Sequence, residues 1–420
     1  MKKLLALLLC LMMLVPMAAM AEGATEITLW TYPIGSWKDS ATVDGIIANF
    51  NAVHPEIKVT VQYLDYSSGD DQVTTAIEAG TTPDIVMEGP ERLVTNWGAK
   101  GKMVDLSDLF TEEVLKDISS EAVLNACKYS DGAYYEFPLC MTTHCMAINY
   151  EAFEAAGALQ YLDLENRTWT TENFQKAMEA LVAAGKVPTG IVYCGGQGGD
   201  QGTRALAANL FSAAFTTPDH TAYTMNSEAG IKGLQLLVDM VKAGTLSADA
   251  GIVASDELQL FANGTAMMSF CWNASNAANY ASSVEFTPYA MAFPSDDGIP
   301  ELCGGIWGFG VFNNGDDAKI AAAKTFIDFV SNDKTQGPAS VYATGFFPVR
   351  ASFGDVYAGT EKAANSEFLT FMPYLGDYYN VTGGWAQQRT EWWGMLQKIF
   401  AGEDVTAAAN AYADASNAGI

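Results

Sequence analysis

The chain opens with strand-like and helix-like segments in alternation, and this alternation limits its possible folds more than any other feature. Residues 27–29 are typical of a short strand, and residues 57–63 alternate apolar and polar side chains as a half-buried strand does. Between them, apolar residues recur at helical spacing from Val43 to Phe50, and another helical stretch precedes a third strand at 83–87. A strand–helix–strand–helix–strand start predicts a doubly wound α/β sheet.

The rest of the chain continues the α/β pattern and predicts two lobes. Apolar stripes of helical spacing occur within residues 174–182, 231–241, 320–330 and 392–400. Extended stretches containing proline at 137–143, 289–294 and 346–349 are interpreted as crossings between lobes. We therefore expect a first lobe of residues 22–141 and 295–346 and a second lobe of residues 142–294 and 347–420. Three short crossings between two lobes make a hinge.

The first residues predict export. Lys2 and Lys3 precede an apolar run over residues 4–15, and a small-x-small motif ends at Ala21. We interpret residues 1–21 as a signal peptide cleaved after Ala21, which places the mature protein in the periplasm or at the cell surface. Cys10 lies in the middle of the apolar run without a small residue before it, so we expect no lipid anchor there.

Charge and cysteine usage exclude several classes of function. The chain has 49 acidic and 22 basic residues, a net charge of -27, and such a chain does not neutralise a nucleic-acid backbone. The six cysteines after the signal peptide are compatible with disulfides or with buried free thiols. A zinc site formed by Cys140, His144 and Cys145 would need side chains from both faces of one strand, so we expect no metal and no cofactor.

Aromatic and polar residues follow predicted strands, and in open α/β sheets ligands bind beyond the carboxyl ends of the strands. Trp30 and Tyr32 follow the first strand, Glu88 the third, and Trp272 a strand at 267–271. The alternative roles are packing for Trp30, helix capping for Glu88 and pinning of the third crossing for Arg350. The candidate ligand-binding residues are Trp30, Tyr32, Glu88, Thr143, His144, Trp272, Asn273, Trp307, Arg350 and Trp385. A glycine-rich loop at 195–200 matches no phosphate-binding pattern and is interpreted as a cleft edge.

Several segments, in order, carry a family resemblance. They are GTTPDI at 80–85, GAYYEFPLCMTTHCMAINYEAFEAAG at 132–157, TWTTENF at 168–174, FANGTAMM at 261–268 and TGFFPVR at 344–350. Together they resemble the carbohydrate-type extracellular solute-binding proteins of ABC importers, the family that includes maltodextrin-binding proteins. Two features depart from the family pattern: Thr265 replaces a common lysine, and no lipobox cysteine is present.

The resemblance implies a two-lobe periplasmic-binding-protein fold, each lobe a sheet flanked by helices, joined by a multi-strand hinge. It also implies a monomer that binds a carbohydrate by lobe closure and delivers it to the transmembrane subunits of an ABC permease. A polyamine or a glycerol phosphoester is the alternative ligand. The remaining alternative is a secreted glycoside hydrolase, although no catalytic motif supports an enzyme.

Overall fold

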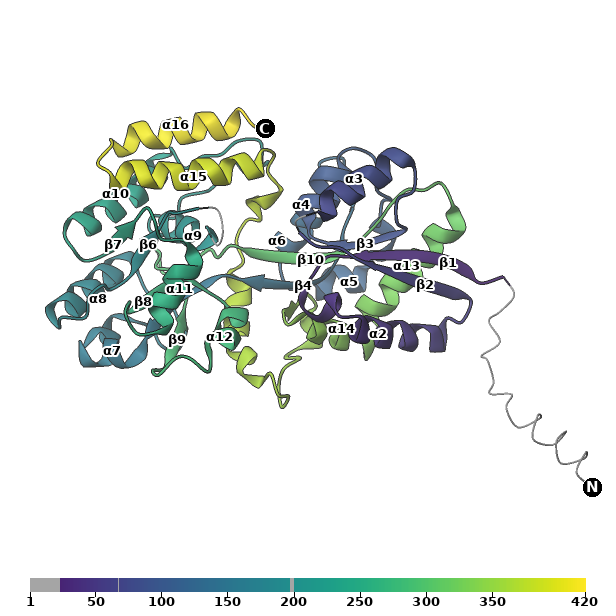
Figure 1. The fold of residues 1–420 in the computed structure, drawn as a ribbon, viewed down its shortest axis with the longest axis horizontal. Coiled ribbons are helices and arrows are strands. Elements are labelled where there is room, and N and C mark those ends of the chain that lie inside the picture. The colour runs from purple at the N-terminus through teal and green to yellow at the C-terminus, as the bar shows by residue number, and fades with distance from the viewer. Residues whose placement is uncertain (1–22, 67, 197–199) are drawn as a thin grey trace, which may run out of the picture.

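The computed structural model describes residues 23–66, 68–196 and 200–420, which form two α/β lobes side by side (Figure 1). The predicted signal peptide lies outside the described residues. Within them, no helix has the length and apolar character needed to cross a membrane. The predicted α/β class and two-lobe architecture are confirmed.

The first lobe is built on a six-stranded sheet with the strand order β11-β4-β10-β3-β1-β2. Its strands are β1 (Thr25–Thr31), β2 (Ile57–Tyr63), β3 (Ile85–Glu88), β4 (Phe137–Thr143), β10 (Gly304–Val311) and β11 (Phe347–Pro348). β1 pairs in parallel with β2 and β3, as the alternating pattern predicted, whereas β10 is antiparallel to β3 and β4. The carboxyl ends of β1 and β3 therefore lie at one edge of the sheet.

Helices cover both faces of this sheet. On one face, Phe50 of α2 and Phe309 of β10 both contact the ring of Phe326 in α13. On the other face, Gly310 of β10 lies against Leu93. The helix α3 on this face is capped at its C-terminus by Gly80, whose φ of 67° is a left-handed conformation that glycine adopts without strain. The helices are α2 (Ser40–Val53), α3 (Gly69–Ala79), α4 (Pro90–Arg92), α5 (Glu112–Asp117), α6 (Glu121–Cys127), α13 (Asp317–Asn332) and α14 (Gln336–Thr344).

The second lobe contains two smaller sheets. β5 (Cys145–Asn149) lies between β8 (Met268–Trp272) and β9 (Pro288–Met291), and β6 (Ile191–Tyr193) pairs with β7 (Ser247–Asp249). Thr170 caps α8 by accepting a hydrogen bond from the Asn173 amide. The helices are α7 (Tyr150–Ala155), α8 (Thr171–Ala183), α9 (Gln201–Asn209), α10 (Glu228–Lys242), α11 (Ala254–Ala262), α12 (Ala274–Tyr280), α15 (Trp385–Phe400) and α16 (Val405–Asn417).

Two strands of the first-lobe sheet run directly into the second lobe (Figure 1). β4 ends at Thr143, and β5 of the second lobe begins at Cys145. β10 follows Cys303, whose carbonyl accepts a hydrogen bond from the His144 amide at 2.8 Å. The two crossings thus lie side by side at His144 and Cys303. The lobe boundaries at residues 141, 294 and 346 stay a prediction.

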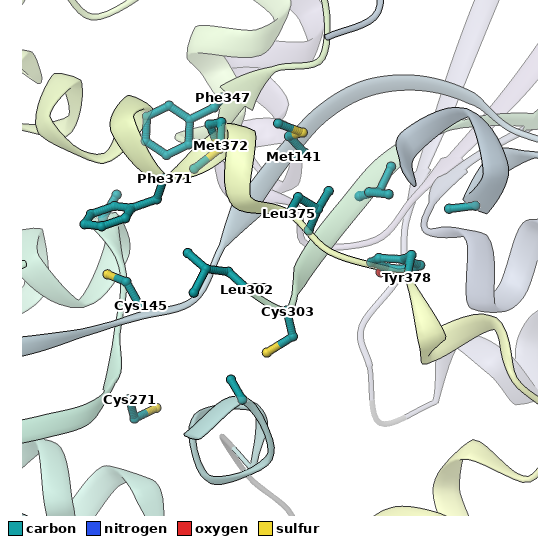
Figure 2. Packing of buried hydrophobic residues seen from close by; sticks show 14 of the residues in the cluster. Met141, Cys145, Cys271, Leu302, Cys303, Phe347, Phe371, Met372, Leu375 and Tyr378 are labelled. Atoms are coloured by element: carbon teal, nitrogen blue, oxygen red, sulfur yellow. The ribbon is translucent and has the colours of Figure 1, made fainter. Parts of the chain in front are cut away.

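A hydrophobic layer covers one side of the crossings (Figure 2). Met141 of β4 pairs with Phe347 of β11, and Leu302 forms a bridge with Leu375. The 3-10 helix η6 (Ala363–Tyr374) supplies Phe371 and Met372 to this layer. The six cysteines of the described chain are buried and free. Of the two predicted alternatives, disulfides or buried free thiols, the structure therefore contains the free thiols.

Candidate functional site

A polar and aromatic cluster lies at the carboxyl ends of β1 and β3. Arg92 donates hydrogen bonds to Asp70 at 2.7 Å and to Glu88 at 2.8 Å. The Tyr32 hydroxyl donates to Asp70 at 2.5 Å, and the Arg92 guanidinium lies 5.1 Å from the Tyr32 ring. Tyr66 stacks on Tyr32 at 5.4 Å and is 51% exposed, so it presents a ring to solvent. We call Tyr32, Tyr66, Asp70, Glu88 and Arg92 the first-lobe cluster.

Glu88 has an unusual environment for a carboxyl group. It is 2% exposed, and its Oε2 has no hydrogen-bond partner within the described part of the chain. Burial raises the pKa of Glu88 to about 8, with Arg92 opposing the shift and Glu91 adding to it. Burial likewise raises the pKa of the neighbouring Glu91 and Glu136. At neutral pH the Glu88 carboxyl is therefore mainly protonated and can act as a hydrogen-bond donor.

β10 supplies an aromatic surface beside this cluster. The Trp307 ring stacks on Phe346 with a centroid distance of 4.4 Å and an interplanar angle of 11°. A Cβ atom on Gly305 would lie 2.2 Å from the Trp307 ring, so the indole lies across a bare stretch of backbone. The side chain of Trp307 also interacts with the Tyr66 hydroxyl. Trp307 therefore adjoins the first-lobe cluster.

The register of β4 against β10 shows which side chains share the face of Trp307. Trp307 pairs with Cys140 and Gly305 pairs with Thr142. Directly paired residues of antiparallel strands project to the same side, so Cys140 and Thr142 share the Trp307 face. Thr143 projects to the other side, is 2% exposed and has a hydroxyl without a partner among the described residues.

A second cluster lies where α9 and α15 begin. Arg389 donates to Asp200 at 2.9 Å, and Arg204 forms an ion pair with the same carboxylate at 3.4 Å. Arg204 is fully buried, and its guanidinium lies 4.4 Å from the Trp385 ring and 5.5 Å from the Tyr379 ring. Contacts of this kind between a cation and an aromatic face are stabilising. We call Asp200, Arg204, Tyr379, Trp385 and Arg389 the second-lobe cluster.

The two clusters lie at the two ends of the same segment of β10. Gly308 pairs with Glu88 of the first-lobe cluster. At the other end, the Cys303 thiol donates to the Gln201 carbonyl at 3.3 Å, at the start of α9. From Cys303 to Gly308 the strand rises about 16 Å. The clusters are therefore separated by more than the length of one pyranose ring.

Three predicted site residues lie away from these clusters. β1 extends to Thr31, because Trp30 pairs with Val86 on one side and Gln62 on the other, so the prediction that Trp30 follows the first strand is wrong. Trp30 lines a separate hollow with Lys102 and Lys319. Trp272 is the last residue of β8, not the residue after it. It is 1% exposed and packs against Phe261. Arg350 is 7% exposed and donates to Asp117 at 2.7 Å and to Asn332. These contacts fit its alternative role, which is to hold the third predicted crossing in place.

His144 and Asn273 contribute to the joint between the lobes. The Asn273 side chain caps α12 by accepting from the Asn276 amide at 2.9 Å. Its amide nitrogen lies 3.4 Å from His144 Nδ1. Burial, with Arg204 as a further cause, lowers the pKa of His144 to about 4, so its ring is neutral at physiological pH. No group of His, Cys, Asp or Glu side chains suited to a metal ion occurs in the described residues.

Sequence reasoning missed Tyr66, Asp70, Arg92 and Arg204. Arg92 follows Glu88 by four residues across a proline that begins a helix, and this spacing allows the two side chains to form a hydrogen bond. Arg204 follows Asp200 by the same interval. These two acid–arginine pairs were the available signal for both clusters.

The chain matches a family of known proteins. Residues 35–337 match the protein family described as bacterial extracellular solute-binding protein. One curated relative, an uncharacterized lipoprotein in the oleD 5' region of Streptomyces antibioticus, is 29% identical over 115 residues, 27% of this chain. The chain spans about a quarter of that relative's length, since the match covers 25% of it.

Solved structures share the fold over nearly the whole chain. The cyclic alpha-maltosyl-1,6-maltose binding protein of Arthrobacter globiformis is 20% identical, with a TM-score of 0.76 over 94% of this chain and 99% of its own. The sugar-binding protein MalE of Xanthomonas citri is 15% identical, with a TM-score of 0.73 over 94% and 97%. A solute-binding protein of Thermotoga lettingae bound with alpha-D-tagatose is 18% identical, with a TM-score of 0.66 over 94% and 99%.

Proposed function

The chain belongs to the bacterial extracellular solute-binding proteins, and from this premise we propose that it captures a sugar or oligosaccharide between its lobes and delivers it to the permease of an ABC transporter. In this role it acts as a monomeric binding protein and not as an enzyme. It is exported, and its signal peptide is cleaved after Ala21.

The arrangement along β10 is the observation that carries the proposal. The Trp307 and Tyr66 rings lie at one end and the Trp385 ring at the other, each half-buried or exposed beside charged hydrogen-bonding side chains. An aromatic ring can stack on the apolar face of a sugar, while carboxyl and guanidinium groups bind its hydroxyls in pairs. The separation of the two ends favours an oligosaccharide over a monosaccharide.

Lobe closure would bring the two clusters onto one ligand. Each cluster belongs to a different lobe. The strands β4 and β10 connect the lobes, and the chain passes from one lobe to the other at His144 and Cys303. A ligand that contacts both clusters only in the closed state favours closure by its difference in affinity for the two states. The Arthrobacter protein is named for binding cyclic alpha-maltosyl-1,6-maltose and the Xanthomonas protein for binding sugar, and both names agree with this ligand class.

The charge state of the site argues against a polyamine. Glu88 is mainly neutral at pH 7 because burial raises its pKa to about 8. In the second-lobe cluster, Arg204 and Arg389 share the single carboxylate of Asp200, so that end keeps a positive charge that repels a polycation. Arg92 and Arg389 are paired with Asp70 and Asp200, so a glycerol phosphoester would have to displace a carboxylate from each.

A ligand screen tests the proposal. The mature chain, residues 22–420, is heated with mono- and oligosaccharides, with spermidine and with glycerol phosphate, at about 20 and 300 mM salt. We expect one class of oligosaccharide to raise the melting temperature at both salt concentrations without being cleaved. At 100 times its dissociation constant, a ligand adds about 2.7 kcal/mol to the unfolding free energy. A salt-sensitive shift with spermidine alone would replace the ligand class, and cleavage of a sugar would support a hydrolase.

A further inference from the structure

A cavity of about 210 Å³ lies between α9 and the segments that enter and leave the hinge. Ala205 and Ala208 of α9 form one wall, and Leu302 and Cys303 at the start of β10 form another. Figure 2 labels Leu302 and Cys303 near the crossing. Asn209 ties α9 to the β10 entry by two hydrogen bonds with the Glu301 backbone, at 2.6 and 2.7 Å. The cavity therefore has a fixed wall on the side of α9.

An aromatic wall separates this cavity from the second-lobe cluster. Phe215 and Tyr379 line the cavity and stack on each other at 4.5 Å with an interplanar angle of 27°. Arg204 lies 5.6 Å from the Phe215 ring and 5.5 Å from the Tyr379 ring, whereas Arg204 itself does not line the cavity. The cavity therefore adjoins the second-lobe cluster, with the Tyr379 side chain between the two.

The lining carries an excess of negative charge. Asp297, Glu301 and Asp377 line the cavity, and the lining contains no lysine or arginine from the described chain. His220 is the nearby basic group, with its Nε2 at 2.9 Å from both carboxylate oxygens of Asp377. Burial raises the pKa of Glu301, and Asp377 and Asp297 raise it further, so these carboxylates lie close enough to repel one another.

We propose that this cavity is a second binding site, which takes a compact organic ammonium ion with an apolar body. The alanines, Leu302 and the aromatic wall accept the apolar body, and the carboxylates accept the charged ammonium group. An apolar cavity of about 150 Å³ holds a benzene molecule, so this cavity has room for one ring and a short aminoalkyl group. A cation next to the Tyr379 ring also gains from its aromatic face.

Benzylammonium is the probe, titrated calorimetrically into the mature chain at low salt, with benzyl alcohol and benzoate as neutral and anionic counterparts. We expect benzylammonium to bind about tenfold more tightly than benzyl alcohol, and benzoate not to bind. The Glu301→Gln variant should lose about tenfold in benzylammonium affinity, and Glu113→Gln, an exposed acid of the first lobe, should leave it unchanged. Ala208→Leu fills the cavity and should abolish binding.

The variants also separate this proposal from the sugar site, on which it does not depend. Sugar binding by Glu301→Gln and Ala208→Leu should equal that of the parent chain, which also verifies their folding. Benzylammonium binding should persist in Trp385→Ala. The proposal is overturned if benzylammonium fails to bind, if Glu301→Gln and Ala208→Leu bind it normally, or if Trp385→Ala alone abolishes it, since the amine would then occupy the sugar site.

Discussion

At the scale of single residues, the proposed site combines aromatic rings with arginines that are already paired. Arg92 joins Asp70 and Glu88, and Arg389 and Arg204 share Asp200. Pairing holds each guanidinium in place before the ligand arrives, so less side-chain freedom is lost on binding. Aromatic rings lie next to these pairs, and removing one of them should lower the affinity for the ligand.

Replacing Trp385 or Trp307 by alanine should weaken binding of the identified sugar by about 1 to 3 kcal/mol, because the stacking surface is lost. Isothermal titration measures the change. The matched control is Trp272→Phe: Trp272 is 1% exposed in the core, so its replacement should lower the melting temperature and leave affinity unchanged. Equal affinity in Trp385→Ala and the parent would remove Trp385 from the site.

Glu88 should make stability depend on pH. Its folded pKa of about 8 lies above its ordinary value of 4.5, so the folded state holds a proton that the unfolded state releases between these values. The contribution of Glu88 to the free energy of unfolding is fully present below pH 4.5 and is lost as pH rises toward 8, by up to about 1.4 kcal/mol per pH unit. Chemical unfolding at several pH values should show a shallower decline for Glu88→Gln. Parallel curves for the variant and the parent would contradict this protonation state.

At the scale of elements, β10 is a strand whose glycines allow other groups to approach its backbone. Cβ atoms on Gly304 and Gly308 would lie 2.0 Å from the Thr142 carbonyl oxygen and 2.2 Å from the Phe137 carbonyl oxygen of β4. Such distances cannot be accommodated without moving the strands. The crossing strands are therefore in closer contact than side chains would permit, and Gly305 serves the Trp307 ring in the same way.

Gly305→Ala should weaken sugar binding by about tenfold, because the new Cβ displaces the Trp307 ring from the backbone. Titration calorimetry on the purified variant measures this loss. Gly45→Ala is the control, since Gly45 is exposed in α2 and a Cβ there would meet no atom within 4 Å. It should keep full affinity and gain about 0.5 to 1 kcal/mol in stability. Normal affinity in Gly305→Ala would show that the position of Trp307 does not matter for binding.

At the scale of the whole molecule, the two lobes are linked by backbone strands without a covalent cross-link between side chains. All six cysteines of the described chain are free and buried, so no disulfide among them links the two lobes. A thiol reagent should therefore label no cysteine of the folded mature protein and six after unfolding. Fewer than six thiols in the unfolded, unreduced protein would indicate a disulfide.

Ligand binding should make the whole molecule more compact. If the clusters at the two ends of β10 close on one sugar, the radius of gyration measured by small-angle X-ray scattering should fall when the sugar is added. Trp385→Ala, with one platform removed, should need a much higher sugar concentration for the same change. A radius that stays constant at saturating sugar would mean that binding occurs without lobe closure.

The sequence by itself determined the α/β class and the helices, and the tertiary structure decided which residues form the site. The periodicities at 43–50 and 57–63 depend on near neighbours in the chain, and α2 and β2 follow them. Exposure depends on distant neighbours: Trp272 ends β8 and Trp385 begins α15, yet Phe261 covers the Trp272 ring and Arg204 lies behind the Trp385 ring. Asp200 and Arg389 are 189 residues apart, so only the packing of α9 against α15 brings their charges together.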